Sequence, residues 1–307
     1  MSLSDDLSKS TLGGNFSFNA STSEDSTITW TAPSILAMII HVLTFLLGVP
    51  GNGAVIWVTG FKMKRNINTV CFLNLAVADL TYCLSLPFQM ANVKLQVSWD
   101  KNFVLWIFFQ SAIILNMSAS VFLLTLISFC RYLAVTRPTW FRHHLSLSWV
   151  RAACFGAWGL AFVMCLPTML VKQIVPYFQD KTWAVLQITW VVFIFILPIV
   201  IMTACYLLIC GELHGKKLAK SNKHVRLTMT VVAVFIISWF PYQACGLVRA
   251  FSNPPALIWC KIAFSLSSFN SALNPLLYVF TGRNFRQVFR RSLAASLRLA
   301  FAEEDQT

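Results

Sequence analysis

Seven long apolar stretches, separated by short polar connections, organise the sequence. They span about residues 33–60, 67–92, 103–135, 149–171, 183–210, 225–251 and 257–280. A helix needs about 20 mostly apolar residues to cross the hydrocarbon core of a bilayer, and each stretch is long enough. Helices are expected because every backbone N–H and C=O must be paired internally there. The pattern therefore predicts an all-α bundle of seven transmembrane helices.

The composition agrees with a chain that faces lipid rather than water. Hydrophobic residues make up 57% of the sequence and charged residues only 11%, whereas a soluble domain carries about 25% charged residues. The formal net charge of +13 could suggest nucleic-acid binding, but the basic residues lie in the gaps between apolar stretches rather than in one patch. We expect a membrane protein with membrane lipids, and no nucleic acid, as partners.

The distribution of Lys and Arg predicts how the chain is oriented. Seven crossings place the termini on opposite sides of the membrane. One side holds 17 Lys and Arg residues and the other holds 7. Because cytoplasmic connections carry the excess of positive charge, the 17-residue side is predicted to be cytoplasmic and the N-terminus extracellular. We expect a multi-pass protein of the plasma membrane.

The two ends of the chain carry separate signals. Asn15 and Asn19 begin Asn-X-Ser sequons, so both are predicted glycosylation sites. Beyond the last stretch, Phe285, Phe289 and Leu293 recur every four residues with arginines between them, which predicts a short amphipathic helix on the inner leaflet. We divide the chain into an extracellular glycosylated tail (1–31), a seven-transmembrane domain (32–281), and a cytoplasmic amphipathic helix with a short tail (282–307).

Asp79 lies in the middle of the second stretch, where a charge is costly and therefore informative. It could be a hydrogen-bonded buried acid that only fixes packing. It could instead be an ion or proton site that responds to conformation. Candidate partners on other stretches are Asn116, Ser120, Asn270 and Asn274. These oxygen-rich groups around one carboxylate would suit a small hard cation such as sodium.

Other polar residues and prolines interrupt the apolar stretches. We interpret Asn52 as a helix–helix hydrogen-bonding residue of the scaffold. Arg131, at the cytoplasmic end of the third stretch, either extends to the membrane surface or contacts a partner on the inner face. Four prolines are expected to kink their helices and to allow two packings of the bundle, namely Pro167, Pro198, Pro241 and Pro275.

An ordered set of motifs runs through the seven stretches. It comprises Gly51-Asn52-Gly53, Leu75-Ala76-Val77-Ala78-Asp79, Arg131-Tyr132, Trp158, Pro198 with Tyr206, Phe235 with Trp239-Phe240-Pro241-Tyr242, and Asn274-Pro275-Leu276-Leu277-Tyr278. This set resembles the rhodopsin-like class of G-protein-coupled receptors. Segments 47–53, 83–88, 115–117 and 119–124 resemble its chemoattractant group, the formyl peptide and complement anaphylatoxin receptors.

The resemblance implies roles for individual residues. The residues that resemble a sodium pocket are Asp79, Asn116, Ser120, Asn270 and Asn274. Those that resemble the activation switch are Phe235, Trp239, Pro241, Tyr206 and Tyr278. Those that resemble the G-protein coupling site are Cys130, Arg131 and Tyr132. No resident cofactor is implied apart from the sodium ion. Activation would be a population shift, in which a ligand favours the coupling state by binding it better.

The sequence departs from the family pattern at two positions. The family has an acid before the arginine that ends the third helix, and this chain has Cys130. That acid would hold Arg131 by a charge-assisted hydrogen bond, so its loss should loosen the resting state. Trp106 occupies the position of a cysteine that most members join to the second outer loop, and residues 171–182 contain no cysteine. We expect that bridge to be absent and the outer lid to be altered.

The expected ligand pocket is apolar and aromatic. The positions that correspond to charged peptide-binding residues of formyl peptide receptors hold Ile114, Leu186 and Trp190, with Trp239 below them. None of these can pair a charge, so formylated peptides should be poor ligands. The expected partners are a peptide or lipid-like extracellular ligand, a heterotrimeric G protein of the Gi type, and arrestin.

Alternative functions remain at this point. A transporter or channel would show inverted repeats and several ionisable groups at mid-membrane, and the sequence shows neither. No combination of residues points to an enzyme, and the nine cysteines include no CxxC pair that would suggest a metal centre. A non-signalling decoy, or a degenerate member of the same receptor family, is the remaining alternative, and Cys130 and the missing disulfide favour it.

Overall fold

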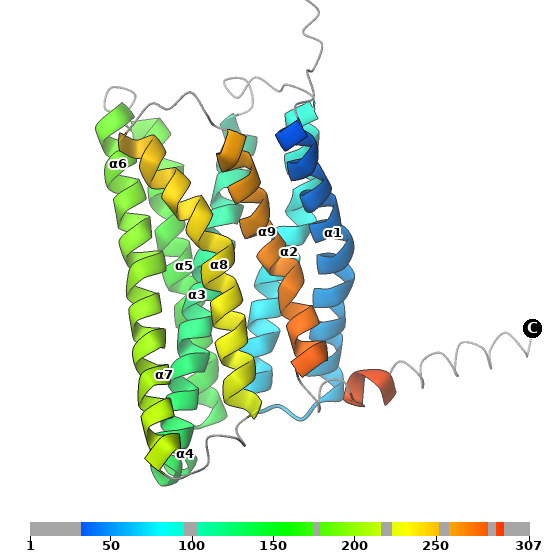
Figure 1. Ribbon diagram of the computed structural model, residues 1–307, viewed down its shortest axis with the longest axis vertical. Coiled ribbons are helices and arrows are strands. Elements are labelled where there is room, and N and C mark those ends of the chain that lie inside the picture. Colours follow the sequence, from blue (N-terminus) through cyan, green and yellow to red (C-terminus); the bar gives the residue numbers. More distant parts are fainter. Residues whose placement is uncertain are drawn as a thin grey trace, which may run out of the picture. The chain divides into compact units, whose positions relative to one another are not determined.

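A computed structural model describes residues 32–94, 103–174, 179–215, 223–251, 258–281 and 287–291 of the protein. The chain divides into two compact units, residues 1–30 and residues 31–307, and every described residue belongs to the second. The described ranges are almost entirely helical (Figure 1). Asn15, Asn19 and most of the segment 282–307 lie outside the described residues, so the predicted glycosylation sites and domain limits stay predictions.

Helices account for all seven predicted stretches. The first span is α1 (Ala32–Trp57) with its continuation η1 (Val58–Lys62). The second, third and fourth are α2 (Ile67–Lys94), α3 (Phe103–Thr136) and α5 (Leu147–Ile174), and a short helix α4 (Pro138–His144) precedes α5. The fifth consists of α6 (Gln179–Trp190), η2 (Val191–Ile196) and α7 (Leu197–Gly215). The sixth and seventh are α8 (Lys223–Phe251) and α9 (Ile258–Thr281).

Six of these spans, within the described residues, are long and apolar enough to cross a membrane on length and composition alone. The seventh, α9, has 24 residues but carries six buried polar side chains, at Ser265, Ser267, Ser268, Asn270, Ser271 and Asn274. It packs against α1, α2 and α8, so these groups face other helices rather than lipid. The predicted all-α seven-transmembrane bundle is confirmed.

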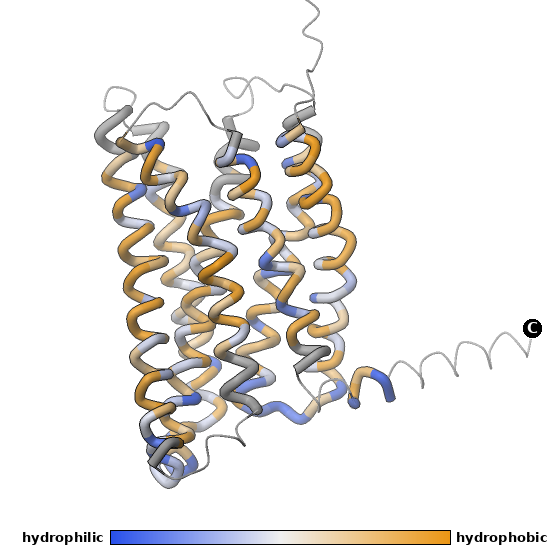
Figure 2. The backbone as a smooth tube through the Cα atoms, in the orientation of Figure 1, coloured by the Kyte–Doolittle hydropathy of each residue, from blue (hydrophilic) through white to orange (hydrophobic). Residues whose placement is uncertain are grey.

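The spans consist mainly of hydrophobic residues (Figure 2), and many large hydrophobic side chains are exposed, as a lipid-facing surface requires. Phe155, Ile237 and Trp259 each expose more than two thirds of their area, at 77%, 72% and 71%. In contrast, Asp79 and Trp239 are fully buried. The charged and amide groups that would be expensive in lipid are thus placed between the helices.

Small residues allow the helices to approach closely. A Cβ on Gly48 of α1 would collide with the Cys83 sulfur of α2 and touch Ala272 of α9. Asn52, one turn further along α1, donates its side-chain Nδ2 to the backbone oxygen of Ser271 at 2.9 Å and to that of Gly48. The predicted scaffold role of Asn52 is confirmed, with α9 as its partner helix.

Prolines and wide turns modify several spans. Pro167, Pro241 and Pro275 lie inside α5, α8 and α9 as predicted, and Pro50 and Pro87 also lie inside α1 and α2. Pro198 lies at the start of α7, directly after the π-helical turn η2. Proline has no N–H to donate, and a wider turn before it accommodates the unpaired carbonyls.

The segment 287–291 is helical. Val288 and Phe289 are half-buried against the hydrophobic core, while Gln287, Arg290 and Arg291 are exposed. Of the three predicted apolar positions, Phe289 lies in this segment, and Phe285 and Leu293 lie outside the described residues. Its position on the inner leaflet stays a prediction, because most of the segment lies outside the described residues.

Candidate functional site

Asp79 is the centre of a polar cluster that joins three spans. Its carboxylate is completely buried on α2. The Asn116 side chain of α3 donates Nδ2 to Oδ1 at 3.3 Å, and the Asn274 side chain of α9 donates Nδ2 to Oδ2 at 2.7 Å. Two of the four predicted partners therefore bind Asp79 directly. A buried carboxylate needs such donors, because an unpaired one would lose its hydration without compensation.

Ser120 and Asn270 complete the predicted set without touching Asp79 through a hydrogen bond. Each lies one helical turn from a direct partner, Ser120 after Asn116 and Asn270 before Asn274, and so on the same helix face. Both are 1% exposed. Within the described residues, the Ser120 hydroxyl, both polar atoms of Asn270 and the Oδ1 of Asn274 have no hydrogen-bond partner.

Ser271 is a member of this cluster that the sequence prediction did not include. Its hydroxyl donates to Asn116 Oδ1 at 3.4 Å and also interacts with Asp79. The signal was available, because Ser271 precedes Asn274 by three residues and so shares its helix face. Serine is common in apolar helices, however, and does not stand out as a charge does.

The cluster has the chemistry of a cation site. Its donors are one carboxylate, hydroxyl groups and amide oxygens, which hard cations prefer. Buried oxygens without partners, at Ser120, Asn270 and Asn274, could act as ligands. Within the described ranges, no group of three or more His, Cys, Asp or Glu residues could hold a metal ion. The residues present therefore fit a monovalent cation such as sodium better than a transition metal.

An aromatic row lies along α8 and continues to the neighbouring helices. Phe235 and Trp239 are fully buried with ring centroids 6.0 Å apart, and Trp239 meets Tyr242 edge-on at 5.8 Å. Tyr242 then contacts Phe264 of α9 at 5.9 Å, which contacts His41 of α1 at 5.3 Å. Pro241 is half-buried within this segment of α8. Ring contacts thus connect Trp239 on α8 with α9 and α1.

The predicted ligand-pocket residues lie in the same hydrophobic core as Trp239. Ile114 is 4% exposed, Trp190 is 7% exposed, and Leu186 is half-buried. The indole N–H of Trp190 donates to the backbone oxygen of Met164 at 3.3 Å, so Trp190 ties α6 to α5. Periodicity alone could not show which neighbouring helix this side chain would contact.

Two glutamines at this level were missed by the sequence prediction. The Gln187 side chain of α6 donates Nε2 to Oε1 of Gln243 on α8 at 3.3 Å. Gln243 is 3% exposed and donates its own Nε2 to the sulfur of Met117 at 3.2 Å. Gly246, one turn further along α8, has no side chain that would collide with Gln187. An amide in an apolar stretch is costly, as Asp79 is, and that was the available signal.

The opposite end of α3 carries Cys130, Arg131 and Tyr132. Cys130 is 4% exposed, and Arg131 and Tyr132 are half-buried. Within the described residues the Arg131 Nε is buried without a hydrogen-bond partner, and no carboxylate is paired with the guanidinium. Nearby, the Tyr206 hydroxyl lies 3.1 Å from the Ser128 hydroxyl. Tyr278 belongs to α9, but its side chain lies outside the described residues.

All the cysteines of the chain lie within the described helices. All nine cysteines are free thiols. Trp106, at the position where a cysteine was expected, belongs to α3, and its side chain lies outside the described residues. The outer connection between α5 and α6 is also only partly described.

Comparison with known proteins finds relatives that match most of the chain. The sequence pattern of the family described as 7 transmembrane receptor (rhodopsin family) matches residues 51–278. The chain is 37% identical over 284 residues to the C3a anaphylatoxin chemotactic receptor of Danio rerio, covering 88% of this chain and 78% of the relative. It is 34% identical over 309 residues to N-formyl peptide receptor 3 of Homo sapiens (90% and 86% covered). It is 35% identical over 293 residues to C5a anaphylatoxin chemotactic receptor 1 of Homo sapiens (89% and 83% covered).

Proposed function

The chain belongs to the rhodopsin family of seven-transmembrane receptors, and on that premise we propose that it transmits a hydrophobic extracellular signal to a Gi-type G protein. It is a receptor of the chemoattractant group and not an enzyme. The names of its relatives, which describe chemotactic and peptide receptors, support signalling over the decoy alternative.

The Asp79 cluster is the observation that carries the proposal. On α3, Asn116 follows the pocket residue Ile114 by two positions and precedes Arg131 by fifteen, which is about 22 Å of helix. The cluster therefore lies between the ligand end and the coupling end. Because α2, α3 and α9 share one carboxylate, a shift of any of these helices must break or re-form a hydrogen bond to Asp79. A junction whose hydrogen bonds break and re-form is the kind of two-state element that a switch requires.

Sodium binding would stabilise the resting arrangement. Asp79 would supply the charge, and the oxygens of Ser120, Asn270 and Asn274 would supply neutral ligands. A ligand present at ten times its Kd stabilises the state that binds it by about 1.4 kcal/mol. We expect sodium, but not a large organic cation, to raise the thermal unfolding temperature of the purified receptor. Asp79→Asn should abolish the difference, and an equal sodium effect in parent and variant would contradict the assignment.

The pocket level supports an apolar ligand with one hydrogen-bonding group. Ile114, Leu186 and Trp190 offer no charge, whereas the Gln187–Gln243 pair offers an amide. A lipid-like molecule with a neutral polar head matches this combination. Signalling assays should therefore show weak or no response to formylated peptides and a response within a panel of lipid mediators. A potent response to formylated peptides would contradict the ligand class without affecting the receptor family.

Coupling at the inner end depends on Arg131. Within the described residues its buried Nε has no hydrogen-bond partner, so the guanidinium would be available to a partner's backbone carbonyls, and arrestin would compete for the same end. In cells that carry sensors for individual G-protein types, expression of the receptor should activate a Gi sensor. Arg131→Ala should abolish the signal at equal surface expression, and Arg142→Ala, an exposed arginine of α4, should leave it intact. Activation of only another G-protein type would contradict the Gi assignment.

The orientation is tested separately. With the N-terminus outside, Asn15 and Asn19 reach the glycosylation machinery in the endoplasmic reticulum lumen. Removal of glycans by an amidase should lower the apparent mass of the receptor, and Asn15→Gln with Asn19→Gln should reproduce the lower mass. An N-terminal epitope accessible only in permeabilised cells would contradict the predicted orientation.

A further inference from the structure

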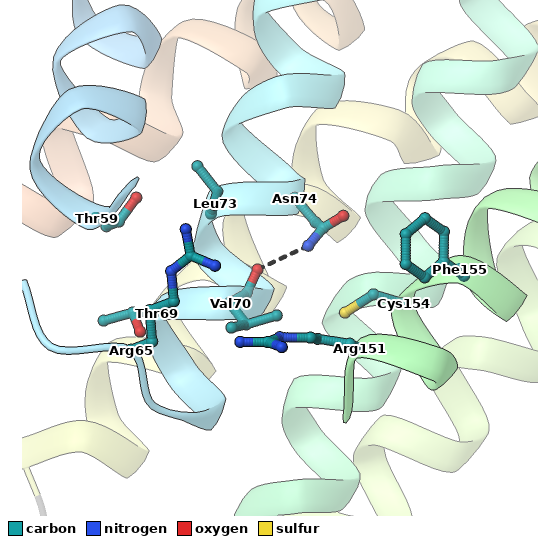
Figure 3. Close-up of a pocket in the computed structure, with 9 residues that line it drawn as sticks. All are labelled: Thr59, Arg65, Thr69, Val70, Leu73, Asn74, Arg151, Cys154 and Phe155. Carbon is teal, nitrogen blue, oxygen red and sulfur yellow. Dashed lines mark hydrogen bonds between the residues drawn. The ribbon is translucent and has the colours of Figure 1, made fainter. Parts of the chain in front are cut away.

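A cleft lies between the end of the first span and the beginnings of α2 and α5, at the end of the bundle that carries Arg131. Its volume is about 170 Å³. Arg65, in the turn before α2, and Arg151, in the first turns of α5, both line it. Figure 3 shows Arg65 rising beside α2 toward Leu73, and Arg151 extending from α5 to just below Val70. Two positively charged side chains thus line one small space.

The remaining polar groups of the cleft already have partners. The Thr59 hydroxyl donates to the backbone oxygen of Val55 at 2.7 Å, and Thr69 exchanges hydrogen bonds with Asn66. The Asn74 side chain donates to the oxygen of Val70 at 2.9 Å and accepts from the indole of Trp158 at 3.1 Å. These bonds fix the conformation of the polar side chains in the cleft wall.

Unlike the polar side chains of the cleft wall, the two guanidinium groups have no partners in the described part of the chain. Within the described ranges neither Arg65 nor Arg151 forms a hydrogen bond or an ion pair, and both residues are exposed. Each guanidinium presents a fixed fork of N–H donors that matches the oxygens of a phosphate group. Their mutual repulsion would fall if an anion lay between them. The cleft therefore presents unused donors for an anion with several oxygens.

The surroundings of the cleft are apolar. Phe155 and Leu73 both line the cleft; Phe155 is 77% exposed, and Leu73 of α2 is half-buried. On this membrane-spanning domain, such surface faces acyl chains. A space of this size corresponds to about five or six water molecules, enough for a phosphate ester but not for a whole phospholipid. The acyl chains of a bound lipid would remain outside, against Phe155.

We propose that this cleft binds the phosphate head group of an anionic phospholipid of the cytoplasmic leaflet through Arg65 and Arg151. The inner leaflet is rich in anionic lipids, so the ligand is present at the predicted depth. The bound phosphate would join the turn before α2 to the start of α5. It would thereby reinforce the Trp158–Asn74 hydrogen bond that joins the same two helices.

Native mass spectrometry of the full-length receptor tests the proposal. The receptor is exchanged from detergent into nanodiscs of phosphatidylcholine that contain either phosphatidylserine or a phosphatidylinositol bisphosphate, and retained lipids are counted. We expect at least one anionic lipid to be retained per receptor, and no specific retention of phosphatidylcholine. Arg65→Gln with Arg151→Gln should lower the lipid association constant at least tenfold.

Two further variants make the result specific. Arg137→Gln with Arg142→Gln removes the same charge from two exposed arginines on the same side of the bundle, outside the cleft, and should change the constant less than twofold. Arg65→Lys with Arg151→Lys keeps the charge but loses the forked geometry, and should bind several-fold more weakly than the parent. Equal binding by the lysine variant and the parent would show a diffuse charge effect and would overturn the built site.

Soluble anions separate the lipid from other sources of phosphate. Inorganic phosphate and a soluble inositol phosphate head group are added in place of the lipid, and each should bind at least tenfold more weakly because neither has acyl chains to lie against Phe155. Equally tight binding of either would overturn the assignment to a membrane lipid. Thermal unfolding confirms that each variant is folded. The measurement involves neither ligand nor G protein, so its outcome is independent of the proposed receptor function. The assignment to the cytoplasmic leaflet rests on the proposed orientation.

Discussion

Replacement of Cys130 by aspartate should restore a restraint that this chain lacks. Cys130 is 4% exposed and precedes Arg131, whose Nε is buried without a partner in the described part of the chain. A carboxylate at this position would accept a charge-assisted hydrogen bond from the guanidinium in the resting state, and coupling would break it. Cys130→Asp should therefore favour the resting state, while Cys130→Asn, nearly identical in shape, should favour it far less.

The size of the effect follows from the burial of the site. A hydrogen bond to a charged group contributes about 1.5–3 kcal/mol. Desolvation of the new carboxylate offsets part of this gain at so buried a position. We therefore take the lower end of that range as the net stabilisation of the resting state. About 1.5 kcal/mol corresponds to roughly a tenfold change in the ratio of resting to coupling-competent receptor.

The assay is basal nucleotide exchange on a Gi heterotrimer in membranes that contain equal amounts of each receptor. We expect Cys130→Asp to lower basal exchange about tenfold and to raise the unfolding temperature, whereas Cys130→Asn changes both only slightly. If the aspartate and asparagine variants show the same basal exchange and the same stability, the argument that Arg131 lacks a restraint is wrong.

Three further predictions concern packing and hydrogen bonding, each measured by thermal unfolding of the purified receptor. Gly48→Ala should destabilise the protein by about 1–3 kcal/mol because the new Cβ collides with Cys83. Gly53→Ala, whose Cβ would have nothing within 4 Å, should be neutral or stabilising. Equal effects of the two substitutions would contradict the close approach of α1 to α2 at Gly48. Gln187→Leu should cost about 1–3 kcal/mol by leaving the buried Gln243 oxygen unpaired, and Gln187→Leu with Gln243→Leu should recover most of it; additive losses would argue against the pair. Trp158→Phe should cost about 1 kcal/mol through loss of the bond to Asn74, and an unchanged unfolding temperature would count against that bond.

Much of the architecture could be predicted from the sequence because lipid imposes strong constraints on it. Asp79 and Asn52 stand out in apolar stretches, and the cost of burying polar groups there forces them toward other helices. Their partners are Asn116, Asn274 and the backbone of Ser271. These residues lie on the third and seventh spans, which the family motifs already identified. For the same reason, polar residues within α9 could be assigned to the bundle interior.

Other features depend on three-dimensional packing that no local pattern encodes. The π-helical turn η1 ends the first span, and η2 directly precedes α7, which contains Pro198. Both depend on local backbone hydrogen bonding that the hydrophobic pattern does not show. The direction of Trp190 toward Met164 depends on the rotation of α6 against α5. Arg65 and Arg151 are 86 positions apart, so their cleft exists only once α2 and α5 are packed. From the sequence, Arg65 and Arg151 could be interpreted only as basic residues at the ends of apolar stretches.

The most direct test of the central claim is reconstituted nucleotide exchange. Purified receptor in nanodiscs is mixed with a purified Gi heterotrimer, and the rate of GDP release is measured with sodium and with sodium replaced by a large organic cation. We predict that the receptor accelerates release, that sodium slows it, and that Asp79→Asn removes the sodium dependence. A folded receptor that fails to accelerate GDP release in either buffer would contradict the claim that the Asp79 cluster links a ligand pocket to a G-protein site.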